Sequence, residues 1–424
     1  MNLSSIESTI ISSSPSMLII QTSIPLDSQS MLSSEEAIQL AVNSTGLLAT
    51  EHAMLQFDTD GRPVDVEGKK YTSKGKVLKQ YQTPYGEAHI ERHVYQSNFG
   101  GTTFCPLDQS ARIIIGSTPR FSKMVSSKYS QMSSSSVKRD LEENHGRTLS
   151  RAFIQDISSS VAGLRQEKKW NYSIDTEQEE VSSIGLSLDG TCMLMCADGY
   201  RQAMVGSISL YDRQGERMHT RYTAFPPEAG KNQFHQVFSK EIEFVKKQYP
   251  SATYVGVADG AADNWSFLGK YVQYQVVDFF HASEYLSKVS KAAFKRPFEG
   301  KAWLDSACSK LKDDQNGAED ILKEMKRMLK KHIRKDKIEE IKTSITYFTN
   351  HLSQMRYRDY QKQNLPIGSG VIEAACKVII KQRLCNSGMK WTDSGAKTVL
   401  TLRCTHESSG MWKQFWSKID RYGK

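Results

Sequence analysis

A short apolar run that ends in an acid constrains this chain most. The run is "VGVADGA", from Val255 to Ala261. Small and branched apolar residues in a run of this length favour a buried strand. The carboxylate of Asp259 follows directly, and a charge at the end of a buried strand is costly unless it has a partner. We therefore expect the rest of the sequence to provide a partner for the Asp259 carboxylate.

Period-two patterns around this run predict a mixed α/β sheet. Three strands separated by turn residues are expected in "VSSIGLSLDGTCMLM", "RQAMVGSISLYD" and "RMHTRYTAFP". An amphipathic helix follows in "NQFHQVFSKEIEFVKKQYP". Two short strands, "TYVGVADG" and "YQVVDFFH", then enclose a helix over about Asp263–Gly269. Hairpin-connected strands followed by strand, helix and strand predict a sheet with antiparallel and parallel parts.

Two aspartates occupy equivalent places in this pattern, and a glutamate joins them. Asp189 is expected to end the first strand, in "GLSLDGT", as Asp259 ends the fourth. If these strands are neighbours, both carboxylates emerge at one edge within reach of a shared divalent cation. Glu373, in the first turn of a helix opened by "GSG", offers a third ligand. Taken singly, each Asp-Gly pair is a common turn, and an acid in a first turn also stabilises a helix, so the hypothesis rests on the set.

Three carboxylates so placed can hold two magnesium ions for in-line displacement at phosphorus, with no covalent protein nucleophile. His281 follows the fifth strand and comes three residues after Asp278. It is a candidate for contacting a scissile phosphate, with Asp278 orienting it. The alternative is that His281 packs or caps a helix, as a lone histidine more often does.

The charge of the chain is uneven. The net charge is +9, but residues 281–424 hold 29 Lys and Arg against 16 Asp and Glu, so they carry +13 and the remainder carries −4. A basic C-terminal third predicts a polyanionic partner, most often nucleic acid, although solvated lysine-rich helix faces give the same count. Basic residues beside an aromatic suit a nucleic-acid backbone and an unstacked base. The candidates here are Arg383, Lys390, Trp391, Lys397 and Arg403.

A second candidate DNA-binding region precedes the sheet. A helix over about Ser135–Asn144, a turn at Gly146 and a second helix capped at Ser150 have the dimensions of a helix-turn-helix. Any short helical hairpin shares this pattern, so the DNA-binding interpretation stays open. Its candidate DNA contacts are Lys138, Arg139, Arg147 and Arg151.

The domain organisation follows from these patterns. We expect a loosely ordered lead-in over 1–35, an N-terminal DNA-binding region over 36–170, a helical insertion over 281–360 and a basic segment over 391–424. The sheet domain is expected over 181–280 and 366–390. Seven scattered cysteines and the absence of an 18-residue apolar run predict a cytoplasmic protein with reduced thiols and no membrane partner.

Four motifs, in order over about residues 181–416, resemble DDE transposases of bacterial insertion sequences. They are "LSLDGT", "GVADGAADNW", "VVDFFHASEYL" and "PIGSGVIEAACK...R...SGMKW", and they are most similar to the ISKra-type group, which is related to Mutator-like enzymes. The resemblance implies a ribonuclease H-like catalytic domain with an all-helical insertion, preceded by a mainly helical DNA-binding region. It assigns the catalytic, metal-binding triad to Asp189, Asp259 and Glu373, and an Asp-x-x-His signature to Asp278 and His281.

The resemblance also implies an activity. The expected protein is a Mg²⁺-dependent transposase, with Mn²⁺ able to substitute, that binds terminal inverted repeats of double-stranded DNA. It would hydrolyse a phosphodiester at each end and join the freed 3′-hydroxyls to target DNA, as a homodimer or higher oligomer near the nucleoid. Many relatives carry a cysteine-pair zinc module before "PLD", whereas this chain offers only Cys105, so four-thiolate zinc binding is not expected. The alternatives are a nuclease of the same fold without strand transfer and a domesticated, non-catalytic DNA-binding protein.

Overall fold

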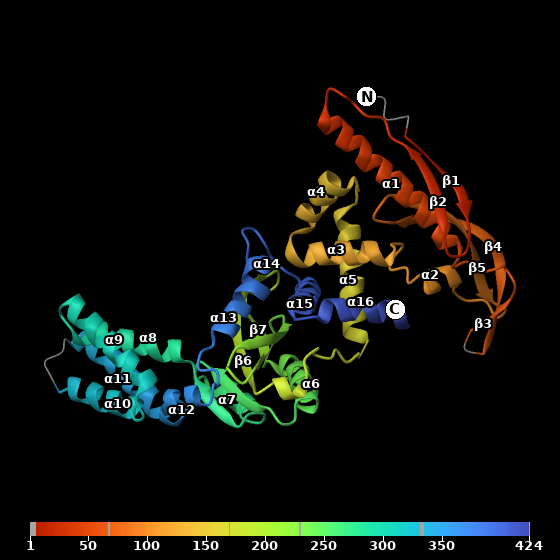
Figure 1. Ribbon diagram of the computed structural model, residues 1–424. Coiled ribbons are helices and arrows are strands. Elements are labelled where there is room, and N and C mark those ends of the chain that lie inside the picture. The colour runs from red at the N-terminus through yellow and green to blue at the C-terminus, as the bar shows by residue number, and fades with distance from the viewer. Residues whose placement is uncertain (1–5, 67, 169, 229, 331–334, 424) are drawn as a thin grey trace. The chain divides into compact units, whose positions relative to one another are not determined.

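The computed structural model divides the chain into two compact units (Figure 1). The first unit comprises Met1–Trp170 and Lys413–Lys424, and the second comprises Asn171–Trp412. The residues described below are 6–66, 68–168, 170–228, 230–330 and 335–423. Among the helices of these residues, none combines the length and the apolar character needed to cross a bilayer.

The first unit begins with ordered structure, which corrects the expected loose lead-in over 1–35. Strands β1 (Glu7–Ser13) and β2 (Leu18–Ser23) form an antiparallel hairpin. Their isoleucines and threonines favour extended backbone even though the segment carries little charge. The hairpin is joined to helix α1 (Met31–Leu55) by a 2.6 Å hydrogen bond between the hydroxyls of Thr22 and Thr45.

A three-stranded antiparallel sheet follows, with β3 (Val64–Val66), β4 (Lys69–Gln82) and β5 (Glu87–Ser97) in that order. Helix α2 (Pro106–Ser110) then precedes a group of longer helices. The expected pair of helices is present, as α4 (Ser134–His145) and α5 (Arg151–Glu167). Between them Gly146 adopts the left-handed conformation, with φ of 60°, and the Ser150 side chain accepts from the Phe153 N–H at the start of α5. Helices α3 (Pro119–Gln131) and α16 (Met411–Tyr422) complete the helical elements of this part of the chain.

The second unit contains the predicted mixed sheet. Its strands are β6 (Ser183–Met195), β7 (Gly199–Tyr211), β8 (Arg217–Phe225), β9 (Thr253–Ala258) and β10 (Tyr274–Val277). They lie in the order β10-β9-β6-β7-β8. The β6–β7 and β7–β8 pairs are antiparallel, whereas β6–β9 and β9–β10 are parallel. The prediction of a mixed α/β architecture is therefore confirmed.

Helix α6 (Asn232–Gln248) covers part of this sheet. Its buried Phe234, Phe238 and Ile242 pack in one core cluster with Leu186 of β6 and Ile208 of β7. Helix α7 (Ala262–Leu268) connects β9 to β10. These elements bury the sheet on the α6 side. The segments that follow β9 and β10 in the chain lie at the carboxyl ends of these strands.

The segment after β10 is helical, as expected. It comprises α8 (Phe279–Ala293), α9 (Pro297–Asp313), α10 (Gly317–Met328), α11 (Lys335–His351), a 3₁₀ turn at Leu352–Gln354, and α12 (Tyr357–Lys362). Figure 1 shows α8 to α11 gathered at one end of the second unit. Leu286, Ile341 and Phe348 of these helices share a core cluster with Val257 and Val276 of the sheet, so the insertion is packed on the β9–β10 side.

The chain then returns to the sheet. Helix α13 (Gly370–Ala375) continues into a π-helical segment, Cys376–Lys381, and α14 (Gln382–Leu384). Helix α15 (Asp393–Glu407) follows. The expected basic segment over 391–424 does not form a separate domain. Its residues up to Trp412 belong to the second unit, and the rest belong to the first.

Candidate functional site

The strand register brings the two predicted aspartates to one level of the sheet. The parallel pairing of β6 with β9 runs from Ser183 opposite Thr253 to Leu186 opposite Gly256. Continuing this register for three residues sets Asp189 level with Asp259. Strand β6 does not end at Asp189, which corrects one expectation, since Asp189 still pairs with Val205 of β7. The two aspartates therefore meet where β9 ends, beside a residue in the middle of β6.

Asp189 lies in a half-buried, acidic environment. One carboxylate oxygen accepts a 2.6 Å hydrogen bond from the Gly190 N–H, and the other is 3.5 Å from the thiol sulfur of Cys376, which donates to it. Burial raises the pKa of Asp189, and the negative charges of Asp259 and Glu373 raise it further. Burial and Asp189 together raise the pKa of the Cys376 thiol to about 12, so this group stays a protonated donor.

Asp259 is exposed, but its backbone is fixed. Its Oδ1 accepts from the Ala261 N–H at 3.0 Å and from the Asn264 amide at 3.2 Å. The Tyr347 hydroxyl of α11 donates to the Asp259 carbonyl oxygen at 2.8 Å. The adjacent Gly260 has φ of +101°, and a Cβ there would lie 3.0 Å from the His351 ring. The helical insertion therefore clamps the Asp-Gly turn, a role for Tyr347 that no local sequence signal indicates.

Glu373 and Asp278 are joined through Ser369. Glu373 is exposed in the first turn of α13, where the Ser369 hydroxyl donates to its Oε1 at 3.1 Å. Asp278 is only 1% exposed and accepts the Ser369 N–H at 3.1 Å. Burial raises the pKa of Asp278, as does the charge of Glu373. The π-helical segment that begins at Cys376 lies next to this acid edge, and such segments are frequent at functional sites.

His281 is not oriented by the carboxylate of Asp278, which corrects another expectation. That carboxylate instead caps α8, because it accepts the backbone N–H groups of Phe280 and His281. The His281 ring lies 3.5 Å from the Glu284 carboxylate, measured from Nδ1, and packs edge-on against Tyr285 and Tyr347. The ring is thus held by α8 and α11 and is only half-buried.

The three acids have the ligand chemistry that Mg²⁺ needs, but their side chains do not form a complete metal site. Carboxylate oxygens are the ligands that Mg²⁺ prefers, and Asp189 lies within electrostatic reach of Asp259 and Glu373. Across the described ranges, however, no three His, Cys, Asp or Glu side chains lie close enough together to hold a metal ion. The carboxylates of these acids must therefore move closer together to coordinate a cation.

Three of the candidate DNA-contacting arginines are interior residues, so direct contact by them is wrong for this structure. Arg383 and Arg403 are each 2% exposed, and Arg147 is 8% exposed. The Arg383 guanidinium lies 5.2 Å from the centre of the Trp391 ring, and Arg403 donates to the Val378 carbonyl. The sequence shows only the charge of these long side chains, whereas their stems and guanidinium groups serve packing and backbone hydrogen bonds.

The remaining basic candidates differ in exposure. Trp391 is half-buried, and its indole N–H donates to the Leu384 carbonyl at 2.8 Å. Lys397 is half-buried, 5.6 Å from the centre of the Phe225 ring, and Lys138 pairs with Glu142 at 3.5 Å. The candidates left exposed are Lys390, Arg139 and Arg151.

A comparison of the chain with protein-family models finds no match, and a comparison with curated proteins also finds none. The functional inference therefore rests on the residues and on their arrangement. Its strongest element is the acid edge, which we define as Asp189, Asp259 and Glu373 with the groups that hold them.

Proposed function

We propose that this protein is a metal-dependent DNA transposase with a ribonuclease H-like catalytic domain. The observation that carries the proposal is the register that sets Asp189 level with Asp259 on adjacent parallel strands. The strand order, with three antiparallel strands followed by two parallel ones on the other side of β6, supports the fold assignment. The helical insertion between β10 and α13 accounts for the long separation of Glu373 from the other two acids.

In this proposal Asp189, Asp259 and Glu373 hold Mg²⁺, for which Mn²⁺ can substitute. The bound metal supplies Lewis-acid activation of a water or 3′-hydroxyl and stabilises the departing oxygen. The chain itself orients the ligands, through Tyr347 on the Asp259 turn and Ser369 on Glu373. His281, half-buried beside this edge, would contact the phosphate.

The DNA partners in this proposal are the terminal inverted repeats of an element and a target duplex. Arg139 and Arg151, exposed on the α4–α5 pair, are the candidates for phosphate contacts in the first unit, and Lys390 is the candidate in the second. Such a protein would act in the cytoplasm, at the nucleoid.

Self-association would bring two DNA ends together, and one surface of the first unit suits it. Of the 23 large hydrophobic side chains exposed in the described chain, 13 lie between Ile10 and Phe57. Residues 8–26, which include most of the β1–β2 hairpin, contain no charged residue or histidine. A two-stranded hairpin with uncharged edges is a template for strand pairing, and a second copy meets it without charge repulsion. A homodimer or higher oligomer is therefore part of the proposal.

The deciding experiment uses a donor plasmid that carries the coding sequence with its natural flanking DNA, and a separate target plasmid. Purified protein with Mg²⁺ is expected to produce donor–target junctions, which are detected by sequencing. Asp259→Asn removes a ligand while nearly preserving shape, and the expected loss of junctions is at least about 100-fold, since even outer partners of metal ligands are worth 10–100-fold. Asp263→Asn, an exposed neighbouring acid, is the matched control and should retain activity.

The alternatives give different results in the same assay. Cleaved donor DNA without junctions, lost in Asp259→Asn, would identify a nuclease without strand transfer. DNA binding without cleavage, equal in wild type and Asp259→Asn, would identify a non-catalytic DNA-binding protein. Equal junction yields from Asp259→Asn and wild type would refute the assignment of this site.

A further inference from the structure

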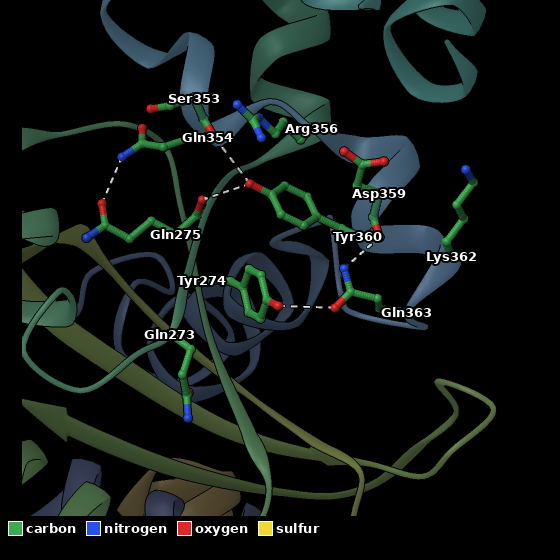
Figure 2. A pocket seen from close by; sticks show the side chains of 10 residues that line it. All are labelled: Gln273, Tyr274, Gln275, Ser353, Gln354, Arg356, Asp359, Tyr360, Lys362 and Gln363. Carbon is green, nitrogen blue, oxygen red and sulfur yellow. Dashed lines mark hydrogen bonds between the residues drawn. The ribbon is translucent and has the colours of Figure 1, made fainter. Parts of the chain in front are cut away.

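A polar hollow of about 730 Å³ opens beside the edge strand β10 (Figure 2). One wall is Gln273, Tyr274 and Gln275, at and just before the start of β10. The opposite wall comes from the 3₁₀ turn and α12, including Arg356, Asp359 and Lys362. A concavity of this size is ample for a nucleotide-sized ligand.

The walls of the hollow are held together by hydrogen bonds. The Tyr357 hydroxyl of α12 donates to the Val277 carbonyl at 2.8 Å, and the Tyr360 hydroxyl donates to the Gln275 carbonyl at 3.5 Å. Both carbonyls belong to β10, the edge strand, so α12 covers part of an edge that would otherwise be open to pairing. The hollow between them is therefore a fixed feature of the second unit.

The polar groups of the walls differ in the hydrogen bonds that they already form within the protein. The side-chain oxygen of Gln273 accepts the Tyr254 N–H at 2.7 Å, and that of Gln275 accepts from the Gln354 amide at 2.9 Å. Figure 2 shows the second of these bonds within the hollow. Each of these oxygens keeps a second lone pair, and each NH₂ group carries two donors, so both glutamines can still donate and accept. The amides of this wall can therefore hydrogen-bond both donors and acceptors of a ligand.

Two cations and one acid complete the lining. Arg356 and Lys362 are both exposed, and neither forms an ion pair with another residue of the described ranges. Unpaired cations together with amide donors favour a phosphate group. The half-buried ring of Tyr274 offers a stacking surface, and the Asp359 carboxylate can accept from the amino group of a base.

We propose that this hollow binds one unpaired nucleotide of the DNA strand. Arg356 and Lys362 hold its phosphate, Gln273 and Gln275 donate to its acceptors, and Tyr274 stacks on its base. A hollow accepts a single unstacked nucleotide more completely than a duplex, whose bases are paired and stacked. The inference rests on the proposed function, because that function identifies DNA as the substrate.

The position of the hollow suits such a role. Gln275 lies three residues before Asp278 on one strand, which is about 10 Å at the usual rise per residue. Asp278 follows Val277, which is opposite Ala258, so it is level with Asp259. A separation of about 10 Å corresponds to about three base steps of a DNA strand. A strand at the acid edge can therefore reach the hollow with nucleotides close to the reacting phosphate.

The test is a binding titration in EDTA, which removes any contribution from catalysis. Three fluorescent probes are used: a blunt 20-base-pair duplex, the same duplex with a five-nucleotide overhang, and the overhang with abasic sugars. Wild type is expected to bind the normal overhang about 10-fold more tightly than the abasic overhang, as the stacking of one base predicts, and to bind the blunt duplex most weakly. The double variant Arg356→Gln/Lys362→Gln should weaken the binding of both overhang probes toward that of the blunt duplex and reduce the magnitude of their salt slope by about 1.4.

Two further variants make the test specific. Gln275→Glu keeps an acceptor for Gln354 but removes the NH₂ donor, so it should also lower overhang binding without affecting the blunt duplex. Lys301→Gln/Lys326→Gln removes the same charge from exposed positions on α9 and α10 outside the lining, and should retain the preference. Thermal melting checks that each variant is folded.

Equal binding of all three probes by wild type would overturn the proposal, as would equal loss in the Lys301/Lys326 control. If no junctions form in the plasmid assay but the overhang preference follows the hollow, the proposed activity fails and the nucleotide site stands. If junctions form without any overhang preference, the nucleotide site fails and the proposed activity stands.

Discussion

The acid edge of the second unit and the α4–α5 pair of the first both carry predicted functional residues, but the two regions hold their charges differently. At the acid edge, Asp189 keeps a half-buried carboxylate near two other acids, although burial and repulsion raise its pKa. On the α4–α5 pair, Arg147 is buried in hydrogen bonds that support the fold, while Arg151 is exposed. An unfavourable placement of charge is stronger evidence of function than an abundance of charge.

The largest stability effect that tests this contrast is expected at Arg147. Its guanidinium donates to the Thr83 carbonyl at 3.1 Å and to the Gln82 side chain, and it lies 5.6 Å from the centre of the Phe121 ring. Arg147→Gln should lower the free energy of unfolding by about 1–3 kcal/mol, since buried acceptors lose their donor. Urea unfolding measures this change, and DNA affinity per folded molecule should stay unchanged.

Arg151→Gln is the matched variant. Because Arg151 is exposed, with one 3.4 Å hydrogen bond to the Ser135 hydroxyl, stability should change by less than about 0.5 kcal/mol. If it contacts a phosphate, the magnitude of the salt slope for duplex binding should fall by about 0.9. The contrast breaks if Arg147→Gln alters the salt slope while leaving stability intact.

These two arginines show what a sequence can and cannot predict. The helix boundaries around Gly146 and Ser150 follow from local capping chemistry, and the strands from period-two patterns, so both are predictable. The burial of Arg147 depends on Thr83, far away in the sequence, and no local pattern contains that contact. Likewise, matching motifs predict the Asp189–Asp259 alignment, whereas the clamping Tyr347 is 88 residues from Asp259 and no motif indicates it.

The clamp gives the next prediction. Tyr347→Phe removes the hydroxyl that donates to the Asp259 carbonyl and keeps the ring stacked on Tyr285 at 3.9 Å. Mn²⁺ affinity, measured by calorimetry, should fall about 10-fold, the lower end for loss of a group that orients a metal ligand. Tyr285→Phe is the control, because the Tyr285 hydroxyl makes no hydrogen bond with another residue among those described. Equal affinities in the two variants would show that the turn needs no clamp.

The last prediction concerns the stability cost of the acid edge in the metal-free protein. The pKa of Asp189 is raised in the folded state above its ordinary value of 3.8, by burial and by the neighbouring acids. The folded chain therefore holds the proton more tightly than the unfolded chain, and deprotonation at neutral pH destabilises the fold. Asp189→Asn removes this cost and should raise the free energy of unfolding by about 0.5–2 kcal/mol in EDTA at pH 7.

The pH dependence distinguishes this explanation from a simple packing change. As pH falls through the raised pKa, wild-type Asp189 takes up its proton and recovers the lost stability. The advantage of Asp189→Asn should therefore shrink with acidity and vanish near the ordinary pKa of 3.8, whereas a packing effect would persist at all pH values. Saturating Mg²⁺ should reverse the order at pH 7, because a cation held by Asp189 stabilises the wild type and not the variant. A variant that is less stable than wild type in EDTA at pH 7 would show that Asp189 is held for the fold rather than for a ligand.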